Sequence, residues 1–467
     1  MTVLTDRGDP VVSIDSSLPM KPASNMKVLT TLAGLEVLGA DYQFETQIVA
    51  TAPLRRGKLA GDLIVYGTGD PNISGRFYDG DVLALFRTWA LRLRNSGLVE
   101  VQGDLIADDS FFDSVRFLPG WKPSAMGRWF SAEISSLNLN DNCVEVQITP
   151  GTPGRKARVE VTPKSPFIEI DGAPRTVAQG KTKITIHRSP TSNRLTVRGQ
   201  IHHKRKTWSD TVAVYDPALF FSYTLERVLE EEGVDIGGIV RRRDRSGAEP
   251  VHPGKLPGSQ LLVDHKSSLL LDLAVINKRS QNLHAEVLLK TLGARAGGEG
   301  SVAGGGRVVR QYLKKLDADV SGLVVADGSG LAHDNRVTTE ILARSLNAAR
   351  DKDYFPTFKK SLPVAGVDGT LAKRFRNEPQ LHGRLFAKTG YILGVSGLSG
   401  YIQRDATVWT FSMLFQRLPG GNSSVKRLQE RIAAAIDRRM AQAQAQAGEG
   451  ERARGREGER VERSGRR

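Results

Sequence analysis

The stretch from Pro22 to Gly39, PASNMKVLTTLAGLEVLG, places a serine three residues before a lysine at the start of a run of helix-forming residues. Residues at positions i and i+3 share one helix face about 5 to 6 Å apart, and the helix N-terminus favours negative charge. Ser24 is therefore a candidate nucleophile with Lys27 as its base, provided that burial or a nearby cation lowers the lysine pKa. Taken alone, the tetrad is more typical of a helix-capping serine followed by a solvated lysine.

Two further stretches favour the catalytic interpretation. In Ser280-Gln281-Asn282, which lies between two helical patterns, a hydroxyl could relay a proton and an amide could bind a carbonyl group. In Lys388-Thr389-Gly390, a strand presents a cation for a carboxylate and then a glycine that lets a substrate backbone come close. Lys388 would also lower the pKa of Lys27 if it lies within several ångströms.

Composition restricts the class of protein. The 467 residues are 39% hydrophobic, and no stretch approaches the roughly 20 consecutive apolar residues of a membrane span. The net charge of +15 comes from basic residues along the whole chain. The basic clumps contain no aromatic residues for base stacking, so we expect no nucleic-acid partner, although weak attraction to anionic wall polymers is possible in principle.

One cysteine, Cys143, excludes a disulfide framework and a CxxC zinc site, and we expect no metal or cofactor. The N-terminus lacks the basic and apolar regions of a secretion signal. We therefore expect either a cytosolic protein or a given start that lies downstream of the real one.

Periodicity predicts one domain that is split by a long insertion. The first 53 residues hold a hairpin (strands 3–5 and 11–14) and the helix after Pro22. Residues 54–260 are β-rich, with helical patterns only at 80–98 and 216–232. Residues 261–440 return to helices (267–292, 307–316 and 338–352) and strands (384–388, 395–403 and 407–415). The two ends complement each other, which indicates an α/β (α+β) fold with an antiparallel sheet covered by helices.

The C-terminal part ends in an amphipathic helix with Val425, Leu428, Ile432 and Ile436 on one stripe, and packing on the sheet is a more probable use of this stripe than membrane binding. Residues 441–467 repeat Ala-Gln and then Gly, Glu and Arg, and nothing in them can form a core. This composition predicts a disordered tail.

The order Ser-x-x-Lys, Ser-x-Asn, Lys-Thr-Gly is the signature of penicillin-binding proteins and serine β-lactamases. From about Val11 to Ala435 the chain resembles one group more closely, the class C low-molecular-mass (type 4) penicillin-binding proteins, a D-alanyl-D-alanine carboxypeptidase/endopeptidase family. The stretches that carry this resemblance are PASNMK, GDLIVYGTGDPNIS, GDLIADDSFFD, SSLNLNDN, RSQNLHAEVLL, DGSGLAHDNRVT, SLPVAGVDGTL and FAKTGYILGVSGLSGY. In that family an insertion follows the nucleophile helix of a transpeptidase-like domain.

The resemblance implies a role for each matching residue. Ser24 is the acylated nucleophile, Lys27 its base, and Ser280 the donor of a proton to the leaving D-alanine. Asn282 holds the acyl-donor amide, and Lys388 and Thr389 bind the terminal carboxylate, with Gly390 beside them. The resemblance also implies that the N–H groups of Ser24 and Tyr391 form an oxyanion hole. It places Asp141 near the amino end of a diamino-acid side chain, and a plain turn is about as good an interpretation of Asp141.

Three features depart from the family pattern. Tyr391 replaces the usual small hydroxyl residue, which puts side-chain specificity in question more than the oxyanion contact. His284 stands where a tyrosine is common, and we interpret it as a packing substitution rather than a base. The given start shows no signal peptide of the family, so export to the periplasm or cell wall is implied by the substrate alone.

The implied activity is hydrolysis of peptidoglycan stem peptides or cross-links through an acyl-enzyme, with β-lactams as acylating inhibitors. The alternatives are a serine β-lactamase, which differs in fast deacylation, and a non-catalytic wall-binding protein on the same fold.

Overall fold

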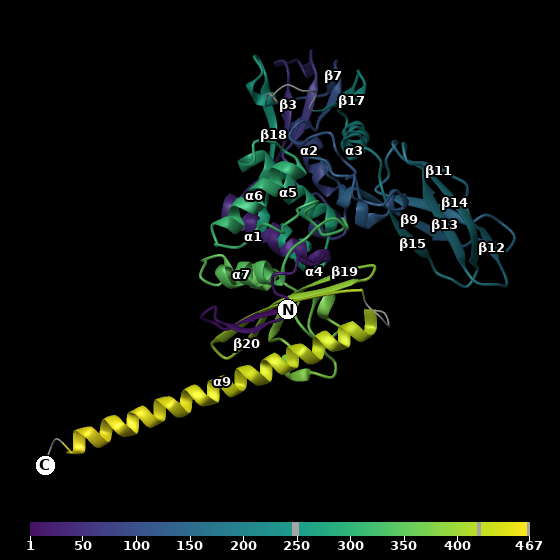
Figure 1. Cartoon of the computed structure of the whole chain (residues 1–467). Helices are drawn as coiled ribbons and strands as arrows, with labels where there is room; N and C mark the ends of the chain where they lie inside the picture. The colour runs from purple at the N-terminus through teal and green to yellow at the C-terminus, as the bar shows by residue number, and fades with distance from the viewer. Residues whose placement is uncertain (245–251, 418–421, 465–467) are drawn as a thin grey trace.

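The computed structural model describes residues 1–244, 252–417 and 422–464, with side chains of the last helix as far as residue 446. A body built around one sheet lies below an upper part rich in strands, and a β-rich lobe projects from one side (Figure 1). The first two strands and the last three strands of the chain lie together in the body, so segments far apart in sequence build its core.

The sheet of the body has five strands in the order β19-β20-β21-β1-β2, and every neighbouring pair is antiparallel. Its strands are β1 (Thr2–Leu4), β2 (Pro10–Ser13), β19 (Leu385–Ile392), β20 (Val395–Arg404) and β21 (Thr407–Gln416). The N-terminal hairpin joins the C-terminal strands through the pairing of β1 with β21. The prediction of an antiparallel sheet assembled from both ends is confirmed.

Helices cover one face of this sheet around α1 (Met26–Leu38), which is buried from Met26 to Leu35. The helices of this layer are α4 (Leu269–Lys278), α5 (Asn282–Ala296), α6 (Val302–Lys314), α7 (Thr339–Ala349) and α8 (Phe355–Ser361). Because α1 is enclosed on nearly all sides, Lys27 in its first turn is held away from water.

The other face of the sheet is covered by α9 (Asn422–Ser464), whose Ala433, Ile436 and Met440 share a core cluster with Leu398 and Phe411 of the sheet. The predicted packing of this helix on the sheet is therefore confirmed. One member of the predicted stripe differs, since the Leu428 side chain is exposed.

Residues 441–464, for which the composition predicts disorder, continue α9 as a helix beyond the body (Figure 1), and the disorder itself stays a prediction. Ala, Gln, Glu and Arg have high helix propensity, so a sequence that builds no core can still extend an anchored helix. The anchor reaches past residue 440, because Gln444 donates hydrogen bonds to the Arg404 carbonyl and the Thr407 hydroxyl. Residues 465–467 lie outside the described residues.

The segment between α1 and α4 forms the upper part and the lobe. A five-stranded mixed sheet, in the order β17-β8-β6-β3-β18, is covered by two helices that lie within the predicted helical ranges. Its elements are β3 (Gln43–Ala50), β6 (Leu63–Gly67), α2 (Ala84–Asn95), β8 (Leu105–Asp108), α3 (Pro217–Glu231), β17 (Val240–Arg243) and β18 (Gln260–Ser268). A small four-stranded sheet beside it is formed by the short strands β4 (Leu54–Arg55), β5 (Lys58–Leu59), β7 (Glu100–Val101) and β16 (Asp235–Ile236).

The antiparallel pair β3 and β18 connects the two parts, because these strands belong to the sheet of the upper part and flank the predicted boundaries at residues 53 and 260. The boundaries themselves stay predictions.

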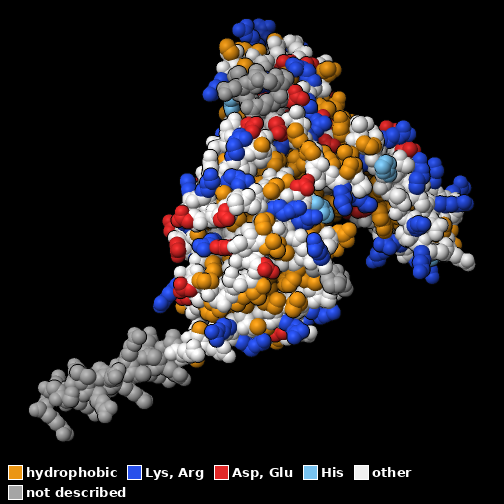
Figure 2. Space-filling model, in the orientation of Figure 1, with side chains coloured by type: hydrophobic (Ala, Val, Ile, Leu, Met, Phe, Trp, Pro, Cys, Tyr) orange, Lys and Arg blue, Asp and Glu red, His pale blue; other side chains and the backbone are white. Residues whose placement is uncertain are grey.

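The lobe consists of a three-stranded and a four-stranded sheet. Its strands are β9 (Cys143–Thr149), β10 (Arg158–Thr162), β11 (Glu169–Asp171), β12 (Arg175–Val177), β13 (Lys183–Arg188), β14 (Arg194–His202) and β15 (Trp208–Ala213). Lys and Arg side chains dominate the charged surface of the lobe in Figure 2. Within the described residues, no helix has the length and apolar character needed to span a bilayer.

Candidate active site

Ser24 lies in a single 3-10 turn, Ala23–Asn25, that directly precedes α1. The helix begins after Asn25, and neither Asn25 nor Pro22 caps the backbone with a side chain. The Ser24 hydroxyl instead accepts a hydrogen bond from Lys27 Nζ at 3.1 Å. The alternative of a capping serine with a solvated lysine is therefore wrong, because Lys27 is fully buried.

Lys27 Nζ has two further acceptors, Asn282 Oδ1 at 2.6 Å and the Ser329 carbonyl at 2.8 Å. Burial lowers the pKa of Lys27 to about 7, against the opposing effect of the Glu286 and Asp327 carboxyl groups. An uncharged amine has two N–H groups and one lone pair. In the charged amine a third N–H donates to Ser24 Oγ. When the amine is uncharged and Asn282 and Ser329 accept its two N–H groups, a lone pair takes the place of that third N–H and accepts from the Ser24 hydroxyl, as a base requires.

Ser280 lies in the connection between α4 and α5, and Asn282 is the first residue of α5. The Asn282 amide is oriented by two contacts, since its Oδ1 accepts from Lys27 and its Nδ2 donates to the Phe130 carbonyl at 2.6 Å. Ser280 has the left-handed φ of 59°. A non-glycine residue in this conformation is held there by its surroundings, which fixes the direction of its hydroxyl.

Lys388 on β19 donates to Ser280 Oγ at 2.8 Å and to the Thr389 carbonyl at 2.9 Å. Burial, and then the charge of Lys27, holds the pKa of Lys388 well below its usual range. Burial is the cause that lowers the pKa of Lys27, and the predicted lowering of that pKa by Lys388 stays a prediction.

A glycine is required at position 390 because the turn that carries Ser24 packs closely against this residue. A Cβ at this position would lie 2.5 Å from Asn25 Nδ2 and 2.9 Å from the Pro22 carbonyl. Only glycine therefore lets the turn that carries Ser24 lie against β19. The predicted close approach exists, but its partner in the structure is the nucleophile turn.

The cleft in front of Ser24 has a volume of about 580 Å³. Four of the predicted site residues line it: Ser24, Ser280, Asn282 and Tyr391. Lys27 and Lys388 reach it from behind, through their hydrogen bonds to Ser24 and Ser280. The Tyr391 side chain lines the cleft and is 53% exposed, and its effect on side-chain specificity stays a prediction.

Thr389 does not line this cleft, and its hydroxyl pairs with the Thr370 hydroxyl at 2.7 Å.

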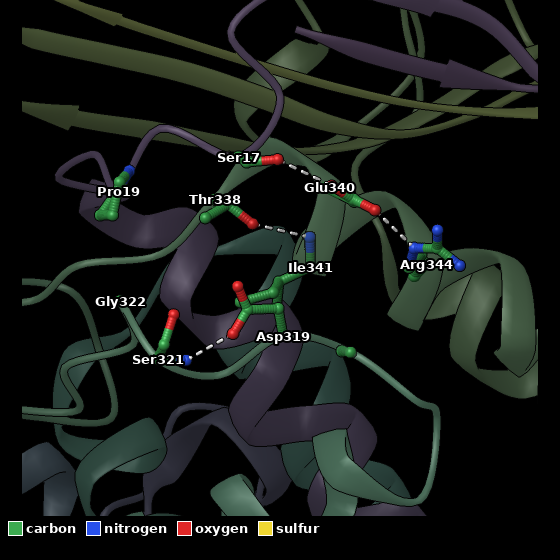
Figure 3. A pocket seen from close by; sticks show the side chains of 10 residues that line it. Ser17, Pro19, Asp319, Ser321, Gly322, Thr338, Glu340, Ile341 and Arg344 are labelled. Carbon is green, nitrogen blue, oxygen red and sulfur yellow. Dashed lines mark hydrogen bonds and ion pairs between the residues drawn. The ribbon is translucent and has the colours of Figure 1, made fainter.

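A different cavity, shown in Figure 3, holds about 70 Å³ and contains none of the predicted site residues. Its polar groups pair with one another: Ser17 donates to Glu340, Arg344 donates to Glu340, and the Asp319 carboxylate accepts from the Ser321 N–H (Figure 3). Its size and its satisfied polar groups make it a poor candidate for substrate binding.

Asp141 lies in an adjoining pocket, where it forms an ion pair with Arg76 at 2.6 Å. His284 lies between two carboxylates, with Nε2 3.0 Å from Asp141 and Nδ1 2.5 Å from Asp272. Burial would lower the pKa of His284, but the two carboxylates outweigh it and raise the pKa to about 9. The interpretation of His284 as a packing substitution is corrected, because it is a buried cation in an ion-pair network.

Sequence reasoning missed Glu286, which is fully buried and accepts hydrogen bonds from the N–H groups of Gly328 at 2.8 Å and Ser329 at 2.9 Å. Burial, and then the charge of Asp327, raises the pKa of Glu286 to about 8. Glu286 thereby fixes the carbonyl that faces Lys27. The signal was present in the sequence, since Glu286 is four residues after Asn282 and shares its helix face.

The acidic residues near β8 pair individually with other groups. Asp108 pairs with Arg243 at 2.5 Å, Asp113 with Lys290 at 2.5 Å, and Asp109 accepts from the Ser136 N–H at 2.7 Å. Within the described parts of the chain, no three His, Cys, Asp or Glu side chains gather as metal ligands would.

Comparison with known proteins adds three findings. Residues 2–442 match the family described as D-Ala-D-Ala carboxypeptidase 3 (S13). A curated relative, the D-alanyl-D-alanine carboxypeptidase of Actinomadura sp. strain R39, is 35% identical over 428 residues, which cover 89% of this chain and 76% of the relative.

The crystal structure of penicillin binding protein 4 from Haemophilus influenzae is similar with a TM-score of 0.79 at 23% identity, and the match covers 93% of this chain and 95% of the other. The same protein complexed with a β-lactam matches with a TM-score of 0.74 at 22% identity, over the same shares of the two chains. At this identity the two structures establish the fold, a transpeptidase domain like that of the penicillin-binding proteins.

Proposed function

The chain belongs to the D-Ala-D-Ala carboxypeptidase 3 (S13) family, and we propose that it is a serine-type D-Ala-D-Ala carboxypeptidase/endopeptidase that acts through an acyl-enzyme on Ser24. The substrates are peptidoglycan stem peptides and cross-links, and β-lactams acylate the same serine. One observation carries the assignment of roles. The buried Lys27 amine has two hydrogen-bond acceptors, Asn282 Oδ1 and the Ser329 carbonyl, and its third contact is Ser24 Oγ.

Acylation begins when the Ser24 proton moves to the uncharged Lys27 amine. Ser24 Oγ then forms a bond to the carbonyl carbon of the penultimate D-alanine, and the resulting oxyanion faces the N–H groups of Ser24 and Tyr391. Removal of one such donor typically slows related reactions by about 10²- to 10³-fold.

The carbon–nitrogen bond breaks when the leaving D-alanine nitrogen takes a proton from Ser280. Lys388 supports this step, since it donates to Ser280 Oγ and leaves the hydroxyl hydrogen free for the cleft. Lys388 also binds the terminal carboxylate together with Thr389, whose hydroxyl turns from Thr370 to the substrate, and Asn282 holds the amide of the acyl donor.

The proton held by Lys27 then passes to Ser280, which restores the uncharged amine and the hydroxyl. Water attacks the ester as Lys27 takes its proton, the bond to Ser24 Oγ breaks, and Lys27 returns the proton to Ser24 as the shortened peptide leaves.

Because the substrate lies outside the cytoplasm, we place the protein in the periplasm or at the cell wall. A β-lactam occupies the site as an ester whose leaving group stays attached, which hinders the attack of water.

A fluorescent penicillin tests this function on one gel. Stable labelling that disappears in Ser24→Ala supports the carboxypeptidase. Rapid turnover without stable label would identify a β-lactamase, and no labelling of folded protein would identify a wall-binding protein. Release of D-alanine from a D-Ala-D-Ala tripeptide provides the direct assay.

A further inference from the structure

The pocket that contains Asp141 has a volume of about 440 Å³ and adjoins the Ser24 cleft. The two cavities share Trp129 and Arg279 in their walls. A substituent of an acyl donor bound in the cleft can therefore enter this second pocket past Trp129, whose side chain is 44% exposed.

The Asp141 carboxylate is already saturated by the protein. Its Oδ1 accepts from Arg76 at 3.2 Å and from His284 at 3.0 Å, and its Oδ2 accepts from Arg76 at 2.6 Å and Gln281 at 2.7 Å. A carboxylate offers about four lone-pair sites, and four N–H donors occupy them. An ammonium group that entered the pocket would find no free acceptor on Asp141.

The network carries no net negative charge. Two cations, Arg76 and His284, face two carboxyl groups, Asp141 and Asp272. The paired cations hold the pKa of Asp141 well below its usual range despite its burial, the His284 pKa is raised to about 9, and burial raises the pKa of Asp272. An ammonium group therefore finds no net negative charge to attract it.

Two more cations line the pocket, and only one of them is paired. Lys278 forms an ion pair with Asp368. Arg279 is exposed, and it makes no side-chain hydrogen bond or ion pair with the described part of the chain. The pocket thus presents one unneutralised positive charge at its junction with the Ser24 cleft.

We propose that this pocket selects acyl donors whose side chain ends in a carboxylate, that Arg279 binds this carboxylate, and that Arg76 blocks recognition of an ammonium group by occupying Asp141. The proposal rests on the proposed function, because it concerns the side chain of the residue before D-Ala-D-Ala. It replaces the expectation that Asp141 contacts the amino end of a diamino acid.

The test uses three N-acetyl tripeptides of the form Xaa-D-Ala-D-Ala with side chains of equal length. Xaa is L-2-aminoadipate (carboxylate), its side-chain amide (neutral) or L-lysine (ammonium). The measured quantity is kcat/KM for D-alanine release by the full chain. We expect the carboxylate donor to exceed the amide by roughly five-fold, the size of one exposed charge-assisted contact, and the lysine donor to be the poorest.

Two variants separate the contributions. Arg279→Gln should reduce the ratio of carboxylate to amide to about one, whereas Arg128→Gln, which removes an exposed arginine that lines the Ser24 cleft but not the Asp141 pocket, should keep the ratio. Arg76→Gln should free the Asp141 oxygens and raise the ratio of lysine donor to amide donor by at least about five-fold. A ratio within one variant does not depend on how much of that variant is folded.

A wild-type preference for the lysine donor, or equal ratios in Arg279→Gln and Arg128→Gln, would overturn the proposal. An unchanged lysine-to-amide ratio in Arg76→Gln would overturn its second half. Failure of the proposed function gives a different result, in which no tripeptide is cleaved and penicillin leaves no label.

Discussion

Asn282→Asp should convert the orienting contact of Lys27 into an ion pair. Asn282 Oδ1 lies 2.6 Å from Lys27 Nζ in a fully buried contact, and the substitution is nearly isosteric. A new carboxylate there favours the charged form of the lysine, which cannot accept the Ser24 proton.

The magnitude follows from the geometry. Two unit charges about 4 Å apart interact by about 4 kcal/mol at an effective dielectric constant of about 20, and desolvation of the new carboxylate offsets part of this. A net effect of about 2.7 kcal/mol raises the pKa of Lys27 from about 7 to about 9. The uncharged fraction at pH 7 then falls from about one half to about one hundredth, so acylation slows about 50-fold. At pH 9 the loss shrinks to about two-fold.

The assay is the second-order rate of labelling by a fluorescent penicillin between pH 5.5 and 9.5. Asn282→Ala is the matched comparison, because it removes the same substrate contact without adding charge, and we expect it to lower the rate without moving the acid limb to higher pH. If Asn282→Asp is slowed by the same factor at every pH, Asn282 does not act through the charge of Lys27, and the reasoning fails.

Three further outcomes are expected. In wild-type protein, acylation should rise about tenfold per pH unit below pH 7 and level off above it, because only uncharged Lys27, with a pKa of about 7, accepts the proton; a flat profile would contradict this. His284→Phe should reduce the free energy of unfolding by about 3 to 5 kcal/mol in denaturant titrations, because Asp272 and Asp141 lose their shared buried cation. The His284 pKa is raised to about 9 in the folded state. The charged imidazole therefore contributes its full stabilisation at pH values below the ordinary histidine pKa, and this stabilisation is lost as the pH rises through 9. The wild type, but not His284→Phe, should lose this part of its free energy of unfolding at alkaline pH. Gly390→Ala should slow acylation by about 10²-fold without loss of fold, because its Cβ displaces the turn that carries the nucleophile; normal labelling would refute the need for this close approach.

The body of the fold was predictable because its signals are local. Alternating strands and helical periodicity located β19 to β21 and α1 within a few residues, and the complementary ends indicated the split sheet. The helix in residues 441–464 was not predictable from composition, because composition indicates the lack of a core but not the continuation of an anchored helix.

The candidate site was predictable where side-chain spacing within one element decides the geometry. Ser24 and Lys27 follow from positions i and i+3 of one turn and helix. The environment of Asp141 did not follow, because Arg76, Gln281 and His284 reach it from segments far apart in the chain. No pattern within one segment reveals that a carboxylate is already saturated by others.

The most direct test of the central claim is mass spectrometry of the protein after reaction with benzylpenicillin, followed by peptide mapping. We predict one added penicilloyl group, carried by the peptide that contains Ser24, and no adduct in Ser24→Ala or Lys27→Ala. An adduct on another residue, or one that persists in either variant, would contradict the assignment of Ser24 as nucleophile and Lys27 as its base.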